Sequence, residues 1–151
     1  MKDVEPPKYK RKEADHYEVS EVALLVDALE SEPLKYRLMV LLTLSCGLRA
    51  GELTGLKWDD INFKENTIKI NKATQYLPMK MYLRRILKNE TSERIISVPE
   101  HVMDLLSVYQ TEYENKQEKH GDLWEDTNYI FTKWNGLHIH PETPGKWFSK
   151  M

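Results

Sequence analysis

The chain has 151 residues, 40% of them hydrophobic and 30% charged, with a formal net charge of −2. That length allows one domain with a hydrophobic core, and no apolar run approaches the roughly 18 residues of a membrane span. The single cysteine, Cys46, excludes an internal disulfide and favours a reducing, cytoplasmic setting. The net charge is not typical of a nucleic-acid-binding protein.

The first 13 residues are predicted to form a basic linker or arm. They contain the adjacent pair Pro6 and Pro7 and five lysines or arginines, with no apolar segment behind them that would make a signal peptide. A tail without fixed structure fits the same residues equally well. The folded domain is then expected to cover residues 14–151.

Three helices are predicted next. Ser20 can cap the first one, which continues to about Leu29 with apolar residues at helical spacing. The second runs from Leu34 to about Cys46 and is apolar almost all round, which is typical of a buried central helix. Gly47 ends it, and a short helix is expected from Arg49 or Ala50 to about Leu56.

Short strands follow. Apolar residues alternate on both sides of a polar turn within Trp58–Asn71, which predicts two strands, and Arg94–Val98 predicts a third. The polar connection Lys72–Glu93 is irregular and receives no assignment. A helix is expected from Pro99, then a short apolar segment at Asn128–Phe131, a turn at residues 134–136 and a last helix from Pro141. The expected fold is mainly α with a small three-stranded antiparallel β-sheet (α+β).

The most informative residues lie where the second helix is predicted to end. Arg49 lies at that junction, and Glu52 follows three residues later, on the same face of a helix. A carboxylate in that position can orient a guanidinium group, and an oriented guanidinium binds a phosphate well. The same spacing also fits a purely structural ion pair.

Two segments resemble the tyrosine recombinases, also called phage integrases. The sequence GLRAGELTGLKWDDIN is similar to the family's first arginine box, with Asn62 in place of the last aspartate. The sequence KNETSERIISVP, which begins at Lys88, is similar to the family's next box, with Asn89 where threonine is commoner. The two boxes occur in the family's order, and the resemblance covers about residues 15–151.

The resemblance implies the front portion of the recombinase catalytic domain, a truncated form of that fold. It also implies an enzyme that breaks and rejoins DNA through a 3′-phosphotyrosyl intermediate, without a metal or other cofactor. Arg49 would stabilise the phosphoryl oxygens, Lys88 would act as general acid, and Glu52 would support the site. Nothing in the chain matches the family's H-x-x-R box or its nucleophilic tyrosine, so we expect the chain alone to be inactive.

The resemblance further implies double-stranded DNA attachment sites as partners and a homo-tetramer on DNA for the full-length parent, which would serve a mobile element or chromosome. The charge distribution is compatible with DNA, because residues 57–94 hold nine Lys or Arg against five Asp or Glu. Candidate contacts with the DNA backbone in this region are Lys80, Arg84, Arg85 and Arg94.

Other interpretations stay open at this point. A DNA-binding or regulatory protein could keep the recombinase fold without its chemistry, and a helical interaction module could carry the boxes by chance. A metal site could be built from His120, Asp122, His138 and His140. Tryptophans 58, 124, 134 and 147 are expected to be core or anchoring residues instead of surfaces for base stacking.

Overall fold

The computed structural model describes residues 16–77, 80–86 and 93–151, so the predicted linker at residues 1–13 lies outside it. The chain divides into two compact units, one ending at Glu30 and the other spanning Ser31–Met151. The first unit contains helix α1 (Val19–Leu29). The backbone N–H of Glu18 donates to the Glu21 carboxylate at 2.8 Å, which fixes the start of α1 before Ser20. The prediction that Ser20 caps this helix is therefore wrong.

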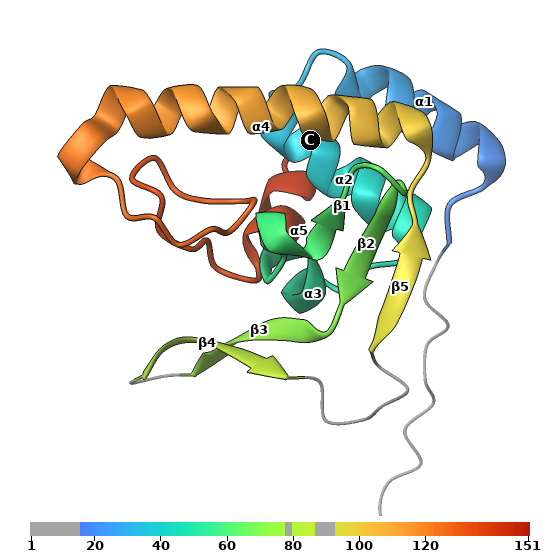
Figure 1. Cartoon of the computed structure of the whole chain (residues 1–151). Helices are drawn as coiled ribbons and strands as arrows, with labels where there is room; N and C mark the ends of the chain where they lie inside the picture. Colours follow the sequence, from blue (N-terminus) through green and yellow to red (C-terminus); the bar gives the residue numbers. More distant parts are fainter. Residues whose placement is uncertain (1–15, 78–79, 87–92) are drawn as a thin grey trace, which may run out of the picture. The chain divides into compact units, whose positions relative to one another are not determined.

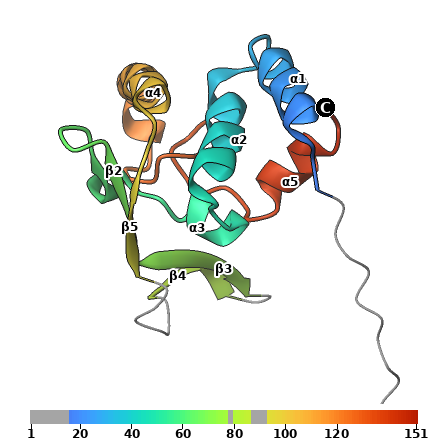
Figure 2. The same cartoon turned by 90° about the vertical axis from the view of Figure 1, so that its right-hand side faces the viewer.

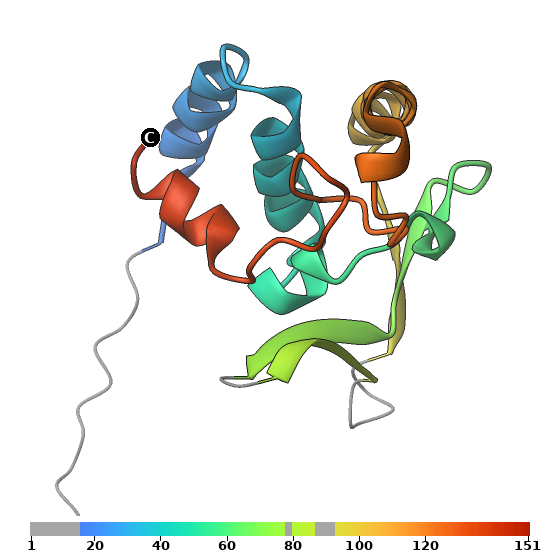
Figure 3. The same ribbon diagram turned by 90° about the vertical axis from the view of Figure 1, so that its left-hand side faces the viewer.

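The second unit is organised around helix α2 (Leu34–Cys46), which confirms the predicted central helix. It contacts α3 (Ala50–Thr54), α4 (Glu100–His120) and α5 (Thr143–Phe148) (Figure 1). The side chains of Leu38 and Leu42 on α2 are completely buried. In Figure 3, α5 (red) lies beside α2 (teal), where the rings of Tyr36 and Trp147 stack with centroids 4.6 Å apart.

The predicted three-stranded antiparallel sheet is confirmed. Its strands are β1 (Ile61–Asn62), β2 (Thr67–Ile70) and β5 (Arg94–Ser97), with β2 in the middle. The turn between β1 and β2 is closed by the side-chain oxygen of Asn62, which accepts the backbone N–H groups of Lys64 and Glu65, both at 3.1 Å. Strand β2 turns Ile68 and Ile70 into the core.

A second sheet fills part of the segment that received no assignment. Strands β3 (Lys72–Leu77) and β4 (Lys80–Ile86) form an antiparallel pair, with an irregularity in register between Gln75 and Leu77. The backbone of β3 contacts α3, and Figure 2 shows the pair of strands lying below that helix. The hairpin is therefore adjacent to the helix that Arg49 precedes.

Aromatic side chains join α4 to the loops around the sheet. Trp58, in the short 3₁₀ turn Trp58–Asp60 (η1), meets the edge of Tyr113 with ring centroids 5.5 Å apart. Tyr109 lies 5.9 Å from Phe131, which belongs to the apolar segment that follows α4. That segment is tied to the chain after α3 by a hydrogen bond from Ile130 N–H to the Leu56 carbonyl at 3.0 Å. Among the described residues, no helix combines the length and apolar character needed to cross a bilayer.

Candidate functional site

Arg49 lies at a joint whose backbone is well defined by local interactions. Helix α2 ends at Gly47, which adopts φ 63° and ψ 34°, a left-handed conformation that glycine accepts without strain. The N–H of Gly47 donates to the Thr43 carbonyl at 2.9 Å. Leu48 is buried, and Arg49 then takes an extended conformation (φ −74°, ψ 152°) directly before α3. The backbone of Arg49 is thus anchored while its side chain is exposed to solvent.

Glu52 is the buried centre of this joint, with only 1% of its surface exposed. Its Oε2 accepts the backbone N–H of Arg49 at 3.0 Å. Both carboxylate oxygens also accept hydrogen bonds from Arg94 on β5, Oε1 from Nη1 at 3.1 Å and Oε2 from Nη2 at 3.0 Å. This two-pronged pair fastens the sheet to the start of α3.

The partner of Glu52 differs from the one that we expected. The predicted pair with the Arg49 guanidinium is not formed, because the carboxylate folds back onto the backbone of Arg49 and meets Arg94 instead. Within the described ranges, no carboxylate forms an ion pair with the Arg49 side chain. Arg94, predicted as a contact for DNA, thus has its guanidinium bound to a buried carboxylate, although 35% of its side chain is exposed.

Each partner in the Glu52–Arg94 pair shifts the pKa of the other in the direction that favours the charged form. Burial by itself raises the pKa of Glu52, but the hydrogen bonds from Arg94 and from the Arg49 N–H, together with both guanidinium charges, leave that pKa below its usual value. The hydrogen bond to Glu52 raises the pKa of Arg94 against the opposing effect of burial. Glu52 is therefore ionised at neutral pH.

His138 connects the loop that follows α4 to the end of α3. Its side chain is 5% exposed, and its Nε2 lies 2.9 Å from the Thr54 carbonyl, which can only accept, so Nε2 carries the proton. The ring also meets Tyr129 edge-on at 4.5 Å. Sequence reasoning considered His138 only as a metal ligand and missed this structural role, because no local pattern links positions 54 and 138.

The buried histidine predicts a stability change with pH. Burial is the main cause that lowers the pKa of His138 to about 4, and the charges of Lys133 and His140 act in the same direction. The unfolded chain binds a proton at this position below about pH 6.5, whereas the folded chain does not until about pH 4. Stability should therefore fall by about 3 kcal/mol as the pH decreases through that window.

Urea unfolding at several pH values measures this effect. The His138→Gln variant keeps a donor for the Thr54 carbonyl but cannot titrate, so its stability should change less between pH 6.5 and 4. The exposed His101 offers a matched control, because His101→Gln should leave the pH profile unchanged. A His138→Gln profile parallel to that of the wild type would contradict the prediction.

The remaining predicted site residues are only partly placed. Lys80, Arg84 and Arg85 belong to strand β4, whose backbone is described, and Lys88 lies outside the described residues. The convergence of Arg49 and Lys88 on one phosphate therefore stays a prediction. In the described part of the chain, no group of three or more His, Cys, Asp or Glu side chains is arranged to hold a metal ion. The proposed metal ligand His138 instead uses its Nε2 for the Thr54 carbonyl.

Comparison with known proteins agrees with this architecture. Residues 17–144 match the model of the phage integrase family. A tyrosine recombinase XerC-like protein of Caldanaerobacter subterraneus subsp. tengcongensis is 25% identical over 150 residues, which cover 92% of this chain and 38% of the relative. The chain thus spans well under half the length of that relative.

Two solved structures share the fold at low sequence identity. The Tn1549 transposon integrase in complex with transposon right end DNA gives a TM-score of 0.73 at 17% identity, covering 93% of this chain and 45% of that one. The XerA recombinase gives 0.64 at 19% identity, covering 89% and 40%. The match to the family model extends over most of the 151 residues and includes the joint at Arg49, the Glu52–Arg94 pair and both sheets. The chain belongs to the phage integrase family.

Proposed function

We propose that this chain supplies the first part of the active site of a site-specific DNA recombinase. In this proposal the Arg49 guanidinium binds a phosphate of the DNA strand that is broken and rejoined. Lys88 would give a proton to the leaving 5′-oxygen, and Glu52 would hold the site in place. The observation that carries the proposal is an exposed arginine whose backbone is anchored by Glu52, while the same carboxylate is paired with Arg94.

The chemistry explains why that arrangement is suitable. Attack by a tyrosine on a phosphodiester builds negative charge on the phosphoryl oxygens, and positive groups already held in position stabilise that charge best. Glu52 would otherwise compete with the phosphate for the Arg49 side chain. Arg94 binds both oxygens of Glu52, and no carboxylate of the described residues pairs with the Arg49 side chain, which supports its role in binding a phosphate.

The cleavage reaction itself would need groups that these 151 residues lack. The sequence holds no H-x-x-R motif, and none of its eight tyrosines lies in the family's nucleophile context. We therefore infer that the chain binds DNA without cutting it. The proposed partners of the whole protein are double-stranded attachment sites, on which it would act as a homo-tetramer in the cytoplasm, in the service of a mobile element or chromosome.

DNA binding by the chain tests the role of Arg49. We expect duplex DNA to bind with a marked salt dependence, and Arg49→Ala to weaken binding about tenfold, because one charged hydrogen-bonded contact to phosphate is lost. The slope of log K against log salt should become shallower by about one unit. Fluorescence anisotropy of a labelled duplex measures both quantities.

A matched variant and a second assay sharpen the test. Arg37→Ala removes the same charge from the first turn of α2, at the other end of that helix, and should change the affinity little. Equal effects of Arg37→Ala and Arg49→Ala would show that only net charge matters and would contradict a phosphate site at the joint. Incubation with nicked DNA should yield no covalent protein–DNA product, and such a product would contradict the inference that the chain is inactive.

The second candidate function is a non-catalytic DNA-binding or regulatory protein with the recombinase fold. Such a protein would need the Glu52–Arg94 pair equally, because the pair stabilises the fold whether or not the protein catalyses a reaction. Covalent capture separates the two functions. If any protein that contains this chain forms a 3′-phosphotyrosyl adduct, and Arg49→Ala abolishes that adduct without abolishing binding, the catalytic function is supported.

A further inference from the structure

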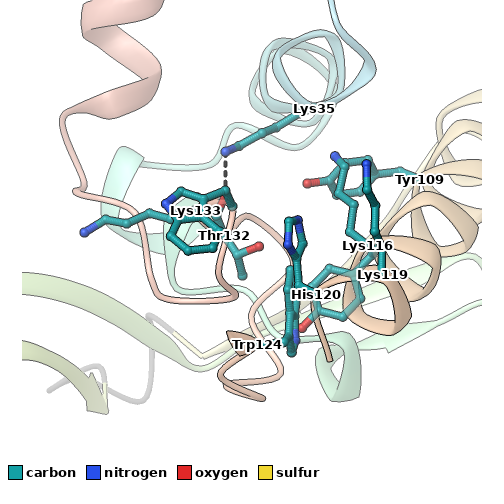
Figure 4. A pocket seen from close by; sticks show the side chains of 10 residues that line it. Lys35, Tyr109, Lys116, Lys119, His120, Trp124, Thr132 and Lys133 are labelled. Atoms are coloured by element: carbon teal, nitrogen blue, oxygen red, sulfur yellow. Dashed lines mark hydrogen bonds between the residues drawn. The ribbon is translucent and has the colours of Figure 1, made fainter. Parts of the chain in front are cut away.

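A pocket of about 270 Å³ lies at the end of α2 that is remote from Arg49. Its walls come from the first turn of α2, the second half of α4 together with Trp124, and the loop at residues 132–134 (Figure 4). Helix α2 has 13 residues, so it is about 20 Å long, and Lys35 and Arg49 lie at its opposite ends. The pocket is therefore separate from the site proposed for the strand-exchange phosphate.

The charged side chains that line the pocket are all basic. They are Lys35, Lys116, Lys119 and Lys133, with the His120 ring beside them, and no carboxylate belongs to the lining. Lys35 donates from Nζ to the Thr132 carbonyl at 2.6 Å, which uses one of its three N–H groups (Figure 4). Figure 4 also shows Lys116 and Lys119 arriving together from α4 on the opposite wall.

The charge of Lys116 opposes that of Lys35 in this pocket. The pKa of Lys35 is lowered to about 8, first by burial and second by the charge of Lys116. The nearby acids Glu112 and Asp126 act on Tyr109 and Tyr113 but do not line the pocket. An anion among the ammonium groups would relieve this repulsion.

The same pocket offers aromatic surface that is accessible from solvent. Trp134 is 64% exposed and meets the edge of the His120 ring at 5.6 Å, which contradicts the expectation that it is a core or anchoring residue. Tyr113 and Trp124 also line the pocket, and their rings meet edge-on with centroids 5.1 Å apart. An exposed indole beside lysines is the combination that single-stranded nucleic acids use, with bases on the ring and phosphates on the ammonium groups.

We propose that this pocket binds one nucleotide unit, with its phosphate among Lys35, Lys116 and Lys119 and its base stacked on Trp134. The volume of about 270 Å³ is slightly below the roughly 300 Å³ at which pockets begin to enclose drug-sized ligands, which favours a single nucleotide unit over a longer ligand. The carboxylates of an acidic peptide would pair with the lysines, but such a peptide would supply no flat ring to stack on the exposed indole. The nucleotide unit is either free or part of a single DNA strand.

Two probes distinguish those sources. The first probe is a labelled, 5′-phosphorylated oligothymidylate of about four nucleotides, whose binding is measured by fluorescence anisotropy. The second is thymidine monophosphate, which is added as a competitor. If thymidine monophosphate displaces the labelled oligonucleotide, the result supports a site for free nucleotides. If the oligonucleotide binds and thymidine monophosphate does not displace it, the result supports a site for single strands. Either result is in accord with the proposal, provided that the variants below reduce it.

The variants separate charge from stacking. The double variant Lys116→Gln, Lys119→Gln should weaken binding at least tenfold, while the exposed pair Lys64→Gln, Lys146→Gln removes the same charge elsewhere and should have little effect. Trp134→Ala should weaken binding roughly tenfold, and Trp134→Phe should retain most of it because it keeps a flat ring. Circular dichroism checks that each variant folds, which the exposure of these side chains favours.

Several results would overturn the proposal. They are the absence of saturable binding, equal affinity in the pocket variants and the wild type, or competition by polyglutamate as strong as that by the unlabelled oligonucleotide. Arg49→Ala should not alter oligonucleotide binding. If Arg49→Ala removed it and the pocket variants did not, the nucleotide would belong to the joint at Arg49 instead. The proposed pocket would then fail without affecting the proposed function of Arg49.

Discussion

Replacing Glu52 with alanine should lower the free energy of unfolding by about 3 kcal/mol, measured by urea denaturation. The carboxylate is 1% exposed, and its removal leaves the Arg94 guanidinium without its two-pronged partner. It also removes the acceptor for the Arg49 N–H at the start of α3. Arg94 can reach water in part, which places the expected loss at the lower end of the range for broken buried ion pairs.

The conservative variant and acid titration refine this result. Glu52→Gln keeps the size of the side chain but not its charge, so it should cost less than Glu52→Ala. Because the hydrogen bonds and charge of Arg94 depress the folded-state pKa of Glu52, its contribution is present above its unfolded pKa and is lost as the pH falls through the folded value. Glu65→Ala, on the exposed turn after β1, should change stability by less than about 0.5 kcal/mol. A loss for Glu52→Ala no larger than that for Glu65→Ala would contradict the proposed structural role.

Replacing Gly136 with alanine should destabilise the protein by about 3 kcal/mol, for two separate reasons. Gly136 has φ 82°, a left-handed backbone conformation that costs conformational free energy for any residue with a Cβ atom. An added Cβ would also overlap the backbone carbonyl of Glu125 and lie 2.8 Å from Cε2 of Trp124. Thermal or urea unfolding of the Gly136→Ala variant measures the total.

Two other glycines allow the backbone strain and the steric overlap to be measured separately. Gly47 has φ 63° but open space around a built Cβ, so Gly47→Ala should cost only the backbone strain, about 1 kcal/mol. Gly145 has neither a positive φ nor a close neighbour, and Gly145→Ala should be neutral or slightly stabilising. Equal losses for positions 47 and 136 would show that Trp124 and Glu125 can move aside, contrary to our expectation.

The helices and the first sheet could be predicted because their signals are local. The apolar spacing of α2, the stop at Gly47 and the alternation in β2 each follow from a few neighbouring residues. Strands β3 and β4 could not be recognised in this way. The stretch YLPMKMYLRRIL shows no regular alternation, and the pairing joins residues whose register shifts between Gln75 and Leu77.

The joint at Arg49 could be predicted, but its partners could not. Spacing indicates that Glu52 is near Arg49, yet helical periodicity cannot reveal that β5 brings Arg94 to the same carboxylate from 42 residues away. The contact of His138 with the Thr54 carbonyl spans 84 positions and is equally invisible to local patterns. The exposure of Trp134 was also misjudged, because composition favours burial of tryptophan and only the path of the loop determines otherwise.

The length of helix α2 sets the separation between the two phosphate sites proposed above. Its 13 residues extend about 20 Å, which equals the rise of about six base pairs of B-form DNA. Six base pairs are a little more than half a helical turn, so one duplex in contact with both ends of α2 would present opposite grooves to them. Contacts at both ends of α2 with one duplex lying along the helix would therefore involve backbone positions about half a helical turn apart.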